Sequence, residues 1–287
     1  MPHPIDYPKK VYLNGEILDA EEARISVFDR GFLFGDGIYE VMARIGGRFF
    51  RQADHMARMQ SCLEKIAIPF DASRLEAEIP ALLEASGLAG QDCLLYLQVT
   101  RGTAPRQHAF PPDAQPTAMM YAWPKTLPEV ETSRASVITR EDFRWHRCDI
   151  KSTSLLGNIL SNQEAASNSC YETIFIRDGR VTEASHCNVF FVRGEVVYTH
   201  PADTNILDGI IRRVVLELCR ELGLEVRLEG VPAGQVRQMD EAFLTGTSTQ
   251  VMAIARVDGE ACYQEAPGPV TRRIQEAFRE AKKGELE

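Results

Sequence analysis

The feature that most constrains the fold of this 287-residue chain is a proline-flanked polar stretch near its middle, Pro124-Lys125-Thr126-Leu127-Pro128-Glu129. Prolines at both ends disfavour a continuous helix or an inner strand, and such stretches are typical of domain boundaries. A chain of this length can also bury two cores. We therefore expect an N-terminal α/β domain over residues 1–123 and a C-terminal α/β domain over residues 134–287, joined by a linker at 124–133.

Both halves mix strand-like and helical segments. In the first half these are hairpin signals at Asn14-Gly15 and Gly46-Gly47, helical spacing over 54–67 and 71–86, and a buried strand over 94–100. The second half alternates strands with a helix over 209–222 and ends in a charged helix. These patterns predict the α+β class, with mixed sheets and flanking helices in two domains.

The net charge and the cysteine content limit the kinds of binding partner and metal site that we expect. The net charge is -9 and no basic block offsets it, so we expect no nucleic-acid partner. No apolar run reaches the length of a membrane span and the N-terminus lacks a signal-peptide core, which predicts a cytoplasmic protein without a membrane partner. The seven cysteines include no C-x-x-C pair. We therefore expect reduced thiols, no bound metal and a packing role for Cys187.

One lysine is a candidate nucleophile. Lys151 follows Ile150 and a strand-like segment and precedes a helix-like stretch. A partly desolvated lysine loses proton affinity and can form a Schiff base. Most lysines lie on solvated faces, however, so the residue alone does not decide between the two interpretations.

Three segments could bind a phosphate, and one acid could bind a protonated ring. Leu207-Asp208-Gly209-Ile210-Ile211-Arg212 opens a helix, whose first N–H groups attract anions. Thr245-Gly246-Thr247-Ser248-Thr249 offers hydroxyl and N–H groups after a strand, and Arg58 offers a fixed charge. Glu183, at the end of a strand, could keep a pyridinium protonated. Each also has an ordinary structural interpretation, as a helix start, a polar turn, a surface arginine or a hairpin carboxylate.

Taken together, these segments resemble a known family. Glu183-x-Ser185-x-x-Asn188-Val189-Phe190, then Val197-x-Thr199, then Leu207-x-Gly209-Ile210-x-Arg212 is similar to the signature of the class IV aminotransferases, which are fold-type IV pyridoxal-phosphate enzymes. The resemblance implies that pyridoxal 5'-phosphate binds at the domain interface. It implies that Lys151 forms the Schiff base and that Glu183 pairs with the pyridine nitrogen. The remaining cofactor ligands it implies are Arg58, Ile210, Ile211, Gly246 and Thr247.

The N-terminal half extends the resemblance to roughly residues 10–280. The run Asp29 to Val41 is similar to the opening motif of the family, and the run Thr100 to Pro111 resembles the substrate loop of its D-amino acid aminotransferase branch. The resemblance implies that Tyr39, Arg106 and His108 bind the substrate α-carboxylate. It also implies that Arg106 and His108 come from a neighbouring subunit, which makes a homodimer with shared active sites. Val41 is expected to line the side-chain pocket.

The resemblance thus predicts transamination of D-amino acids, such as D-alanine or D-glutamate, with 2-oxoglutarate or pyruvate. The alternatives within the fold are a branched-chain L-amino acid aminotransferase, an (R)-amine transaminase and a 4-amino-4-deoxychorismate lyase. A non-catalytic cofactor-binding module is the alternative from another class. Three departures from the D-amino acid branch stand out. Gly246 replaces a serine, as in branched-chain relatives, and His186 and Cys187 replace small hydroxyl residues.

Overall fold

The computed structural model describes residues 8–263 and 266–286. The chain divides into two compact units. The first runs up to Thr126 and includes Ile150–Leu155, and the second comprises Leu127–Asp149 and the chain from Leu156 to Glu285. Within the described ranges, no helix has both the length and the apolar character that crossing a bilayer requires.

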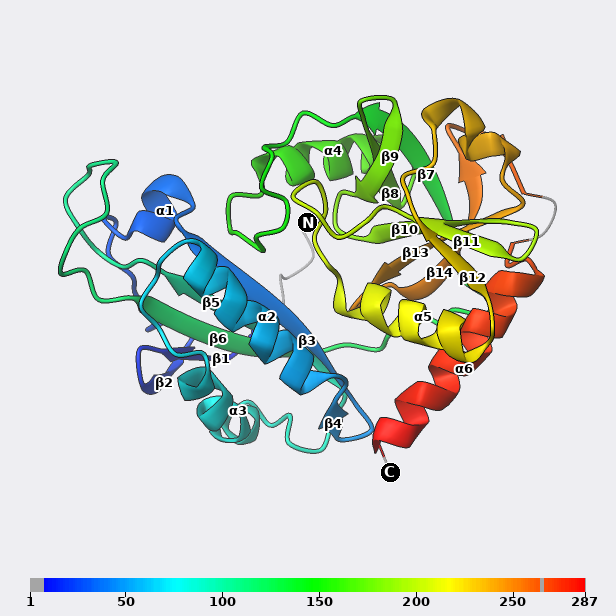
Figure 1. Ribbon diagram of the computed structural model, residues 1–287. Helices are drawn as coiled ribbons and strands as arrows, with labels where there is room; N and C mark the ends of the chain where they lie inside the picture. The colour runs from blue at the N-terminus through cyan, green and yellow to red at the C-terminus, as the bar shows by residue number, and fades with distance from the viewer. Residues whose placement is uncertain (1–7, 264–265, 287) are drawn as a thin grey trace. The chain divides into compact units, whose positions relative to one another are not determined.

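The first unit is built on an antiparallel sheet in the order β2-β1-β6-β5-β3-β4 (Figure 1). Its strands are β1 (Lys10–Leu13), β2 (Glu16–Asp19), β3 (Gly37–Ile45), β4 (Arg48–Phe49), β5 (Cys93–Thr100) and β6 (Thr117–Pro124). The hairpins predicted at Asn14-Gly15 and Gly46-Gly47 are confirmed. All four residues have positive φ, which these short turns need and which asparagine and glycine adopt at little cost.

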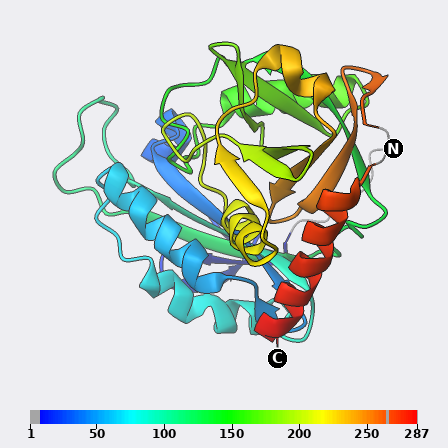
Figure 2. The same cartoon turned by 45° about the vertical axis from the view of Figure 1, so that its right-hand side comes forward.

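The two helices predicted over 54–67 and 71–86 are confirmed as α2 (Gln52–Lys65) and α3 (Ser73–Ala85). They lie side by side on one face of this sheet (Figure 2). A short helix, α1 (Arg30–Phe34), precedes β3. Successive side chains of a strand point to opposite faces. Along β3, Ile38 and Met42 join the core beneath the helices, whereas Tyr39 lies on the other face and stacks on Tyr96 of β5, with 5.6 Å between ring centroids.

The segment Ile150–Leu155 pairs with the start of β3. Tyr39 N–H donates to Lys151 O at 3.0 Å, Thr153 N–H donates to Gly37 O at 3.0 Å, and Ser152 forms a bridge with Ile38. These contacts place Lys151 with the first unit, whereas the sequence analysis assigned it to the C-terminal domain. The sequence could not indicate this difference, because a pairing between residues more than a hundred positions apart leaves no local pattern.

The second unit contains a mixed sheet in the order β12-β11-β10-β13-β14-β7-β8-β9, with β15 paired to β14. Its strands are β7 (Arg134–Glu141), β8 (Glu172–Arg177), β9 (Arg180–Ala184), β10 (Asn188–Arg193), β11 (Val196–Thr199), β12 (Glu225–Leu228), β13 (Glu241–Gly246), β14 (Gln250–Val257) and β15 (Glu260–Ala261). β7 runs parallel to β8 and β14, and β11 runs parallel to β12. The predicted α+β class is therefore confirmed, and a mixed sheet is found in this unit, whereas every pairing in the sheet of the first unit is antiparallel.

Helices flank this sheet. They are α4 (Leu156–Ser167), α5 (Ile210–Glu221), α6 (Pro269–Leu286) and the 3-10 helix η1 (Ala233–Gln238). α5 buries Val214, Val215 and Leu218 along one face, which is the spacing that predicted it. It contacts β12 and β13, and α4 contacts β7 and β8. The start of α5 thereby lies at a fixed place beside β10 and β13, where the predicted phosphate ligands are found.

Candidate active site

Lys151 lies against the ring of Tyr39 in the first unit. Its Nζ is 4.2 Å from the ring centroid. Its backbone is fixed at both ends of the residue, because the N–H donates to Cys62 Sγ of α2 at 3.4 Å and the carbonyl accepts from Tyr39 N–H. The predicted amine and one predicted carboxylate ligand therefore come together, although they are 112 positions apart. An ammonium over an aromatic face is a favourable contact.

Arg58, a predicted phosphate ligand, is held by a buried carboxylate. Its Nε and Nη2 donate to Glu40 of β3 at 2.9 and 2.7 Å, and His55 Nδ1 lies 3.0 Å from the same carboxylate. Burial acts to raise the pKa of Glu40, but Arg58 and His55 outweigh it and hold that pKa well below its ordinary value. Burial lowers the pKa of His55. Arg58 is thus fixed in orientation by a two-point bond.

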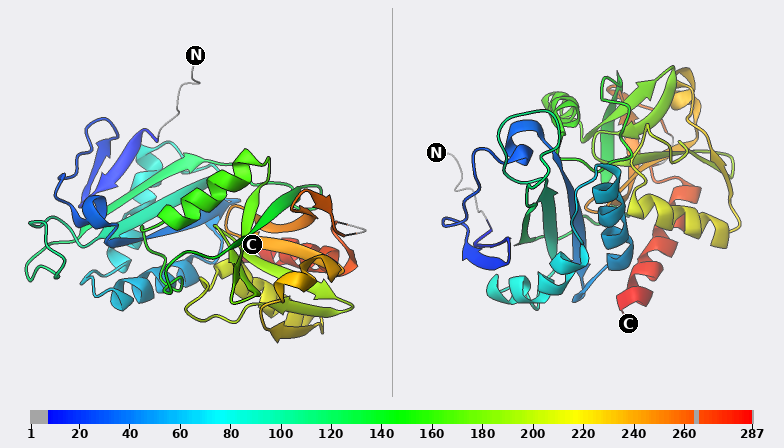
Figure 3. Two further views of the ribbon diagram at one scale, coloured as in Figure 1. Left: turned by 90° about the horizontal axis from the view of Figure 1, so that it is seen from above. Right: turned by 60° about the vertical axis from the view of Figure 1, so that its left-hand side comes forward.

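Arg106 and His108 belong to the loop between β5 and β6, which extends beyond the strand ends (Figures 1 and 3). Both residues pack on Phe34 of α1. Arg106 Cζ lies 5.2 Å from the centroid of the Phe34 ring, and the ring centroids of His108 and Phe34 are 5.8 Å apart. Arg30 anchors the loop by donating to Gln107 O at 2.6 Å. Both predicted ligands are exposed, and their described contacts are with α1 rather than with Lys151.

Glu183 lies at the end of β9 in the second unit and is buried. Its Oε1 accepts from Arg144 Nη1 at 2.8 Å, and its Oε2 accepts from Leu207 N–H at 3.0 Å and Asn188 Nδ2 at 3.2 Å. Burial raises the pKa of Glu183 to about 7, and the opposing Arg144 limits the rise. The exposed hairpin carboxylate that was the ordinary interpretation is therefore wrong.

Glu183 is linked to the start of α5 through Asn188. The Asn188 amide donates to Leu207 O at 2.8 Å as well as to Glu183. Gly209 is the N-cap of α5, and a Cβ there would come within 2.2 Å of Asn188 Oδ1. Among the described residues, no side chain caps the helix at Gly209, which leaves the first N–H groups of Ile210 and Ile211 suited to an anion. The predicted acid and the predicted phosphate-binding turn are thus parts of one local structure.

The turn after β13 carries the remaining predicted ligands, Gly246 and Thr247. A Cβ at Gly246 would lie 3.3 Å from Cys187 Sγ, so the two departures noted in the sequence are neighbours. Cys187 Sγ is 3.2 Å from Thr249 Oγ1, which in turn bonds Tyr171 OH at 2.7 Å. The small residue at 246 gives room to the sulfur of Cys187. Next to this turn, Thr245 Oγ1 is buried and has no hydrogen-bond partner in the part of the chain that the structure describes.

The sequence analysis missed several residues that position the predicted ones. Arg144 pairs with Glu183, Glu40 and His55 hold Arg58, and Asn188 joins Glu183 to α5. Asn188 and Glu40 lie inside runs that carried the resemblance, which was a usable signal. Arg144 and His55 lie outside those runs, and their importance depends on contacts with Glu183 and Glu40 that the sequence does not show.

The chain is also similar to known proteins over most of its length. The model of the family described as amino-transferase class IV matches residues 37–257, and the protein belongs to this family of aminotransferases. It is similar to the D-alanine aminotransferase of Bacillus licheniformis, with 39% identity over 272 residues that cover 94% of this chain and 95% of the relative. The D-alanine aminotransferase of Staphylococcus epidermidis is 36% identical over 273 residues, 94% of this chain and 96% of the relative.

Solved structures agree on the fold. The branched-chain amino acid aminotransferase from Thermobaculum terrenum in its PLP-form superposes with a TM-score of 0.84 and 26% identity, covering 96% of this chain and 94% of that one. The fold is therefore that of the fold-type IV aminotransferases, and the fold predicted from the resemblance is confirmed.

Proposed function

We propose that this protein is a pyridoxal-phosphate-dependent aminotransferase that moves the amino group of D-amino acids, such as D-alanine and D-glutamate, to 2-oxo acids. Pyruvate and 2-oxoglutarate are the proposed acceptors. The observation that carries the proposal is the position of the Lys151 amine over the ring of Tyr39, in a chain similar to D-alanine aminotransferases over nearly its full length. All seven cysteines are free, as suits the cytoplasm, where we place the enzyme.

The residues present fit the cofactor. Lys151 supplies the amine, Glu183 a buried carboxylate, Arg58 a charge, and the N-terminus of α5 an uncapped anion site. The unpartnered hydroxyl of Thr245 is a further free donor beside the predicted ligands Gly246 and Thr247. When bound, pyridoxal phosphate supplies an electron-withdrawing ring that takes up the charge left on the substrate when its Cα proton is removed.

Each proposed catalytic residue has one task. The Lys151 amine accepts the Cα proton of the substrate and later returns a proton, as general base and then general acid. Glu183 holds a proton on the cofactor's ring nitrogen, and a carboxylate kept in place by Arg144 and Asn188 suits that task. The Arg106 guanidinium can meet the α-carboxylate with two parallel hydrogen bonds, and Tyr39 and His108 complete that grip. Val41, next to Glu40 on β3, would line the side-chain pocket.

We propose that the enzyme works as a homodimer in which each substrate site receives Arg106 and His108 from the partner subunit. Both residues lie on an exposed loop whose contacts are with α1. Around that loop the surface is unusually apolar for a free face, with exposed side chains at Ile25, Val27, Phe28, Phe32 and Phe110. An apolar surface of this kind is typical of a protein interface.

A branched-chain L-amino acid aminotransferase is the second candidate. Gly246 favours it, since the resemblance implies glycine at this position in branched-chain enzymes, and the similar Thermobaculum terrenum enzyme is of that type. The pair Arg106 and His108 favours the D-specific enzyme. An amine transaminase would have no use for a full set of carboxylate ligands, because its amine substrates carry no α-carboxylate.

The absorption spectrum of the cofactor-loaded protein separates these candidates. We expect a yellow form whose band fades on addition of D-alanine and stays on addition of L-alanine or L-leucine. Fading with L-leucine alone would transfer the assignment to the branched-chain enzyme. A yellow protein indifferent to all three amino acids would favour the amine or lyase chemistry, and failure to bind the cofactor would refute the enzyme.

A further inference from the structure

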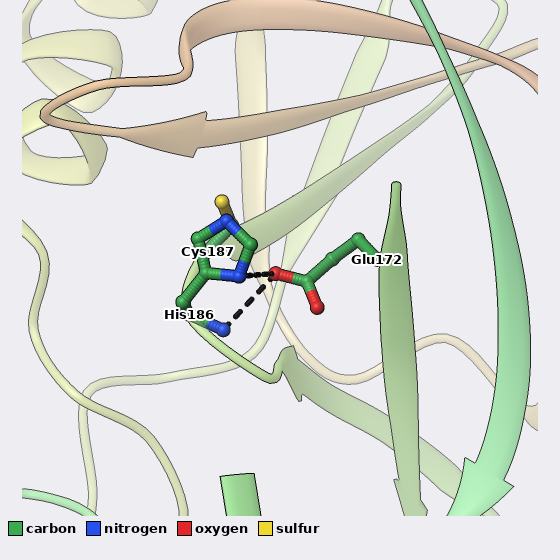
Figure 4. A group of neighbouring side chains, drawn as sticks. All are labelled: Glu172, His186 and Cys187. Atoms are coloured by element: carbon green, nitrogen blue, oxygen red, sulfur yellow. Dashed lines mark hydrogen bonds and ion pairs between the residues drawn. The ribbon is translucent and has the colours of Figure 1, made fainter. Parts of the chain in front are cut away.

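A second group of reactive side chains lies in the second unit, beside the turn that carries the proposed cofactor ligands Gly246 and Thr247. Glu172 begins β8, and His186 and Cys187 follow in the connection between β9 and β10. One ligand atom from each lies within 4.8 Å of the others. Figure 4 shows the imidazole between the thiol and the carboxylate, with Nδ1 of His186 2.6 Å from Oε2 of Glu172.

The carboxylate of this group is fixed in advance. Glu172 has no exposed side-chain surface. Its Oε1 accepts from Thr173 N–H at 2.8 Å, from Ser185 N–H at 3.1 Å and from the Ser185 hydroxyl, and its Oε2 accepts from His186 N–H at 3.0 Å. Hydrogen bonds that orient a ligating carboxylate are a regular feature of metal sites. The backbone thus holds Oε2 toward the imidazole before any ion binds.

The three donor atoms favour some metal ions over others. One thiol, one imidazole and one carboxylate are the ligands of Zn²⁺ and similar transition ions, whereas Mg²⁺ and Ca²⁺ prefer sets of oxygens only. A divalent ion bound to a thiolate, a carboxylate and a neutral imidazole forms an electrically neutral unit, so burial leaves no net charge to compensate. We propose that Glu172, His186 and Cys187 bind Zn²⁺, with water as the fourth ligand.

The geometry allows the ion to enter. Zinc bonds of about 2.0–2.3 Å bring tetrahedral ligand atoms to about 3.5 Å from one another. The ligand atoms now lie within 4.8 Å of one another, so wider separations must close. The 2.6 Å between His186 Nδ1 and Glu172 Oε2 must open to about 3.5 Å if Nδ1 is the ligand atom. The imidazole can supply this movement, because 43% of the His186 side chain is exposed and the other two residues are buried. The site does not depend on the proposed reaction.

Titration calorimetry of Zn²⁺ into the chelator-treated holoenzyme tests the proposal. We expect one ion per chain in the wild type. His186→Ser and Cys187→Ser each remove a ligand and should weaken binding by at least about 100-fold, judged from the 10–100-fold effect of second-shell changes. Cys170→Ser alters a free, partly exposed thiol outside the cluster and should leave the affinity unchanged.

Cobalt adds a readout that identifies the sulfur ligand. Co²⁺ in the wild type and in Cys170→Ser should give the intense ligand-field bands of a tetrahedral site, together with a thiolate charge-transfer band that Cys187→Ser lacks. If Cys187→Ser fails to fold by circular dichroism, His186→Ser, altered at a partly exposed position, decides the question. The absence of zinc binding in the wild type, or equal binding in all variants, would overturn the site and leave a simple ion pair of Glu172 and His186.

Discussion

Arg144 and Glu183 form a buried ion pair, in which Nη1 lies 2.8 Å from Oε1 and the two side chains are only 5% and 6% exposed. Arg144 also bonds Asp142 with Nε and Nη2, each at 3.0 Å, and lies over the ring of Phe175. The position and ionisation of the acid proposed to face the cofactor therefore depend on an arginine that has no direct role in the proposed chemistry.

Removing the Arg144 side chain should lower the free energy of unfolding substantially. Arg144→Ala leaves Glu183 buried without its cation, and breaking a buried pair in this way costs about 3–5 kcal/mol. Urea unfolding of the cofactor-free protein measures the loss. The matched control is Arg140→Ala, whose pair with Glu164 is largely solvated and should contribute less than about 1 kcal/mol. Equal effects of the two substitutions would contradict the importance given to the buried pair.

The raised pKa of Glu183 should appear as a pH-dependent stability. The ordinary pKa of this group is 4.5, and burial raises it to about 7 in the folded state. The folded protein therefore holds a proton that the unfolded chain releases, which stabilises it fully below pH 4.5. This contribution, on the order of 3 kcal/mol, is lost as the pH rises through 7. Glu183→Gln should lack it, and wild-type and variant curves that stay parallel across this range would exclude the shift.

The contact between Gly209 and Asn188 should tolerate no side chain. Gly209 has an ordinary φ of -64°, so alanine meets no backbone strain there, but its Cβ would lie 2.2 Å from Asn188 Oδ1. Displacing Asn188 loosens Glu183 and the start of α5 together. We expect Gly209→Ala to destabilise the protein by about 1–3 kcal/mol and to weaken cofactor binding. Gly234→Ala, where a Cβ meets nothing within 4 Å, should be neutral in both measurements.

Glu40 should stabilise the first unit at neutral pH. Glu40→Gln keeps the shape of the side chain but leaves Arg58 buried beside a neutral amide, at a cost of about 3 kcal/mol or more. Because the pKa of Glu40 is held below its ordinary value of 4.5, its contribution is present above that pH and is lost as the pH falls further. Thermal unfolding of both proteins during acidification should show the difference shrinking, whereas a constant difference would argue against the ionised pair.

Local sequence patterns predicted the helices and strands, but they did not predict contacts between residues that are far apart in the sequence. The dipeptide Asn14-Gly15 predicts its hairpin because the turn itself requires residues with positive φ. The pairing of Lys151 with β3 has no such local requirement, so its unit was misassigned. The sequence likewise does not indicate the cluster of Glu172, His186 and Cys187. Its first two members are 14 positions apart, which is not a familiar spacing of zinc ligands. The roles proposed for Lys151, Glu183 and Arg106 came from motif resemblance rather than from spacing.

The proposed sharing of the substrate site between subunits can be tested by complementation. Lys151→Ala and Arg106→Ala should each lower D-alanine transamination by at least about 100-fold as homodimers, since one lacks the general base and the other the carboxylate fork. When the two variants are unfolded together and refolded as a mixture, a mixed dimer contains one site with both residues intact. Random pairing should then restore about a quarter of the wild-type sites.

The control for this experiment is a mixture of Arg106→Ala with His108→Ala. Both changes lie on the same loop, so every site in a mixed dimer still receives one damaged loop, and no activity should return. If the loop instead served the site of its own subunit, the first mixture would stay inactive as well, because each chain would carry either the damaged lysine or the damaged loop into its own site. Recovery in the first mixture and not in the second is therefore the outcome that only a shared site produces.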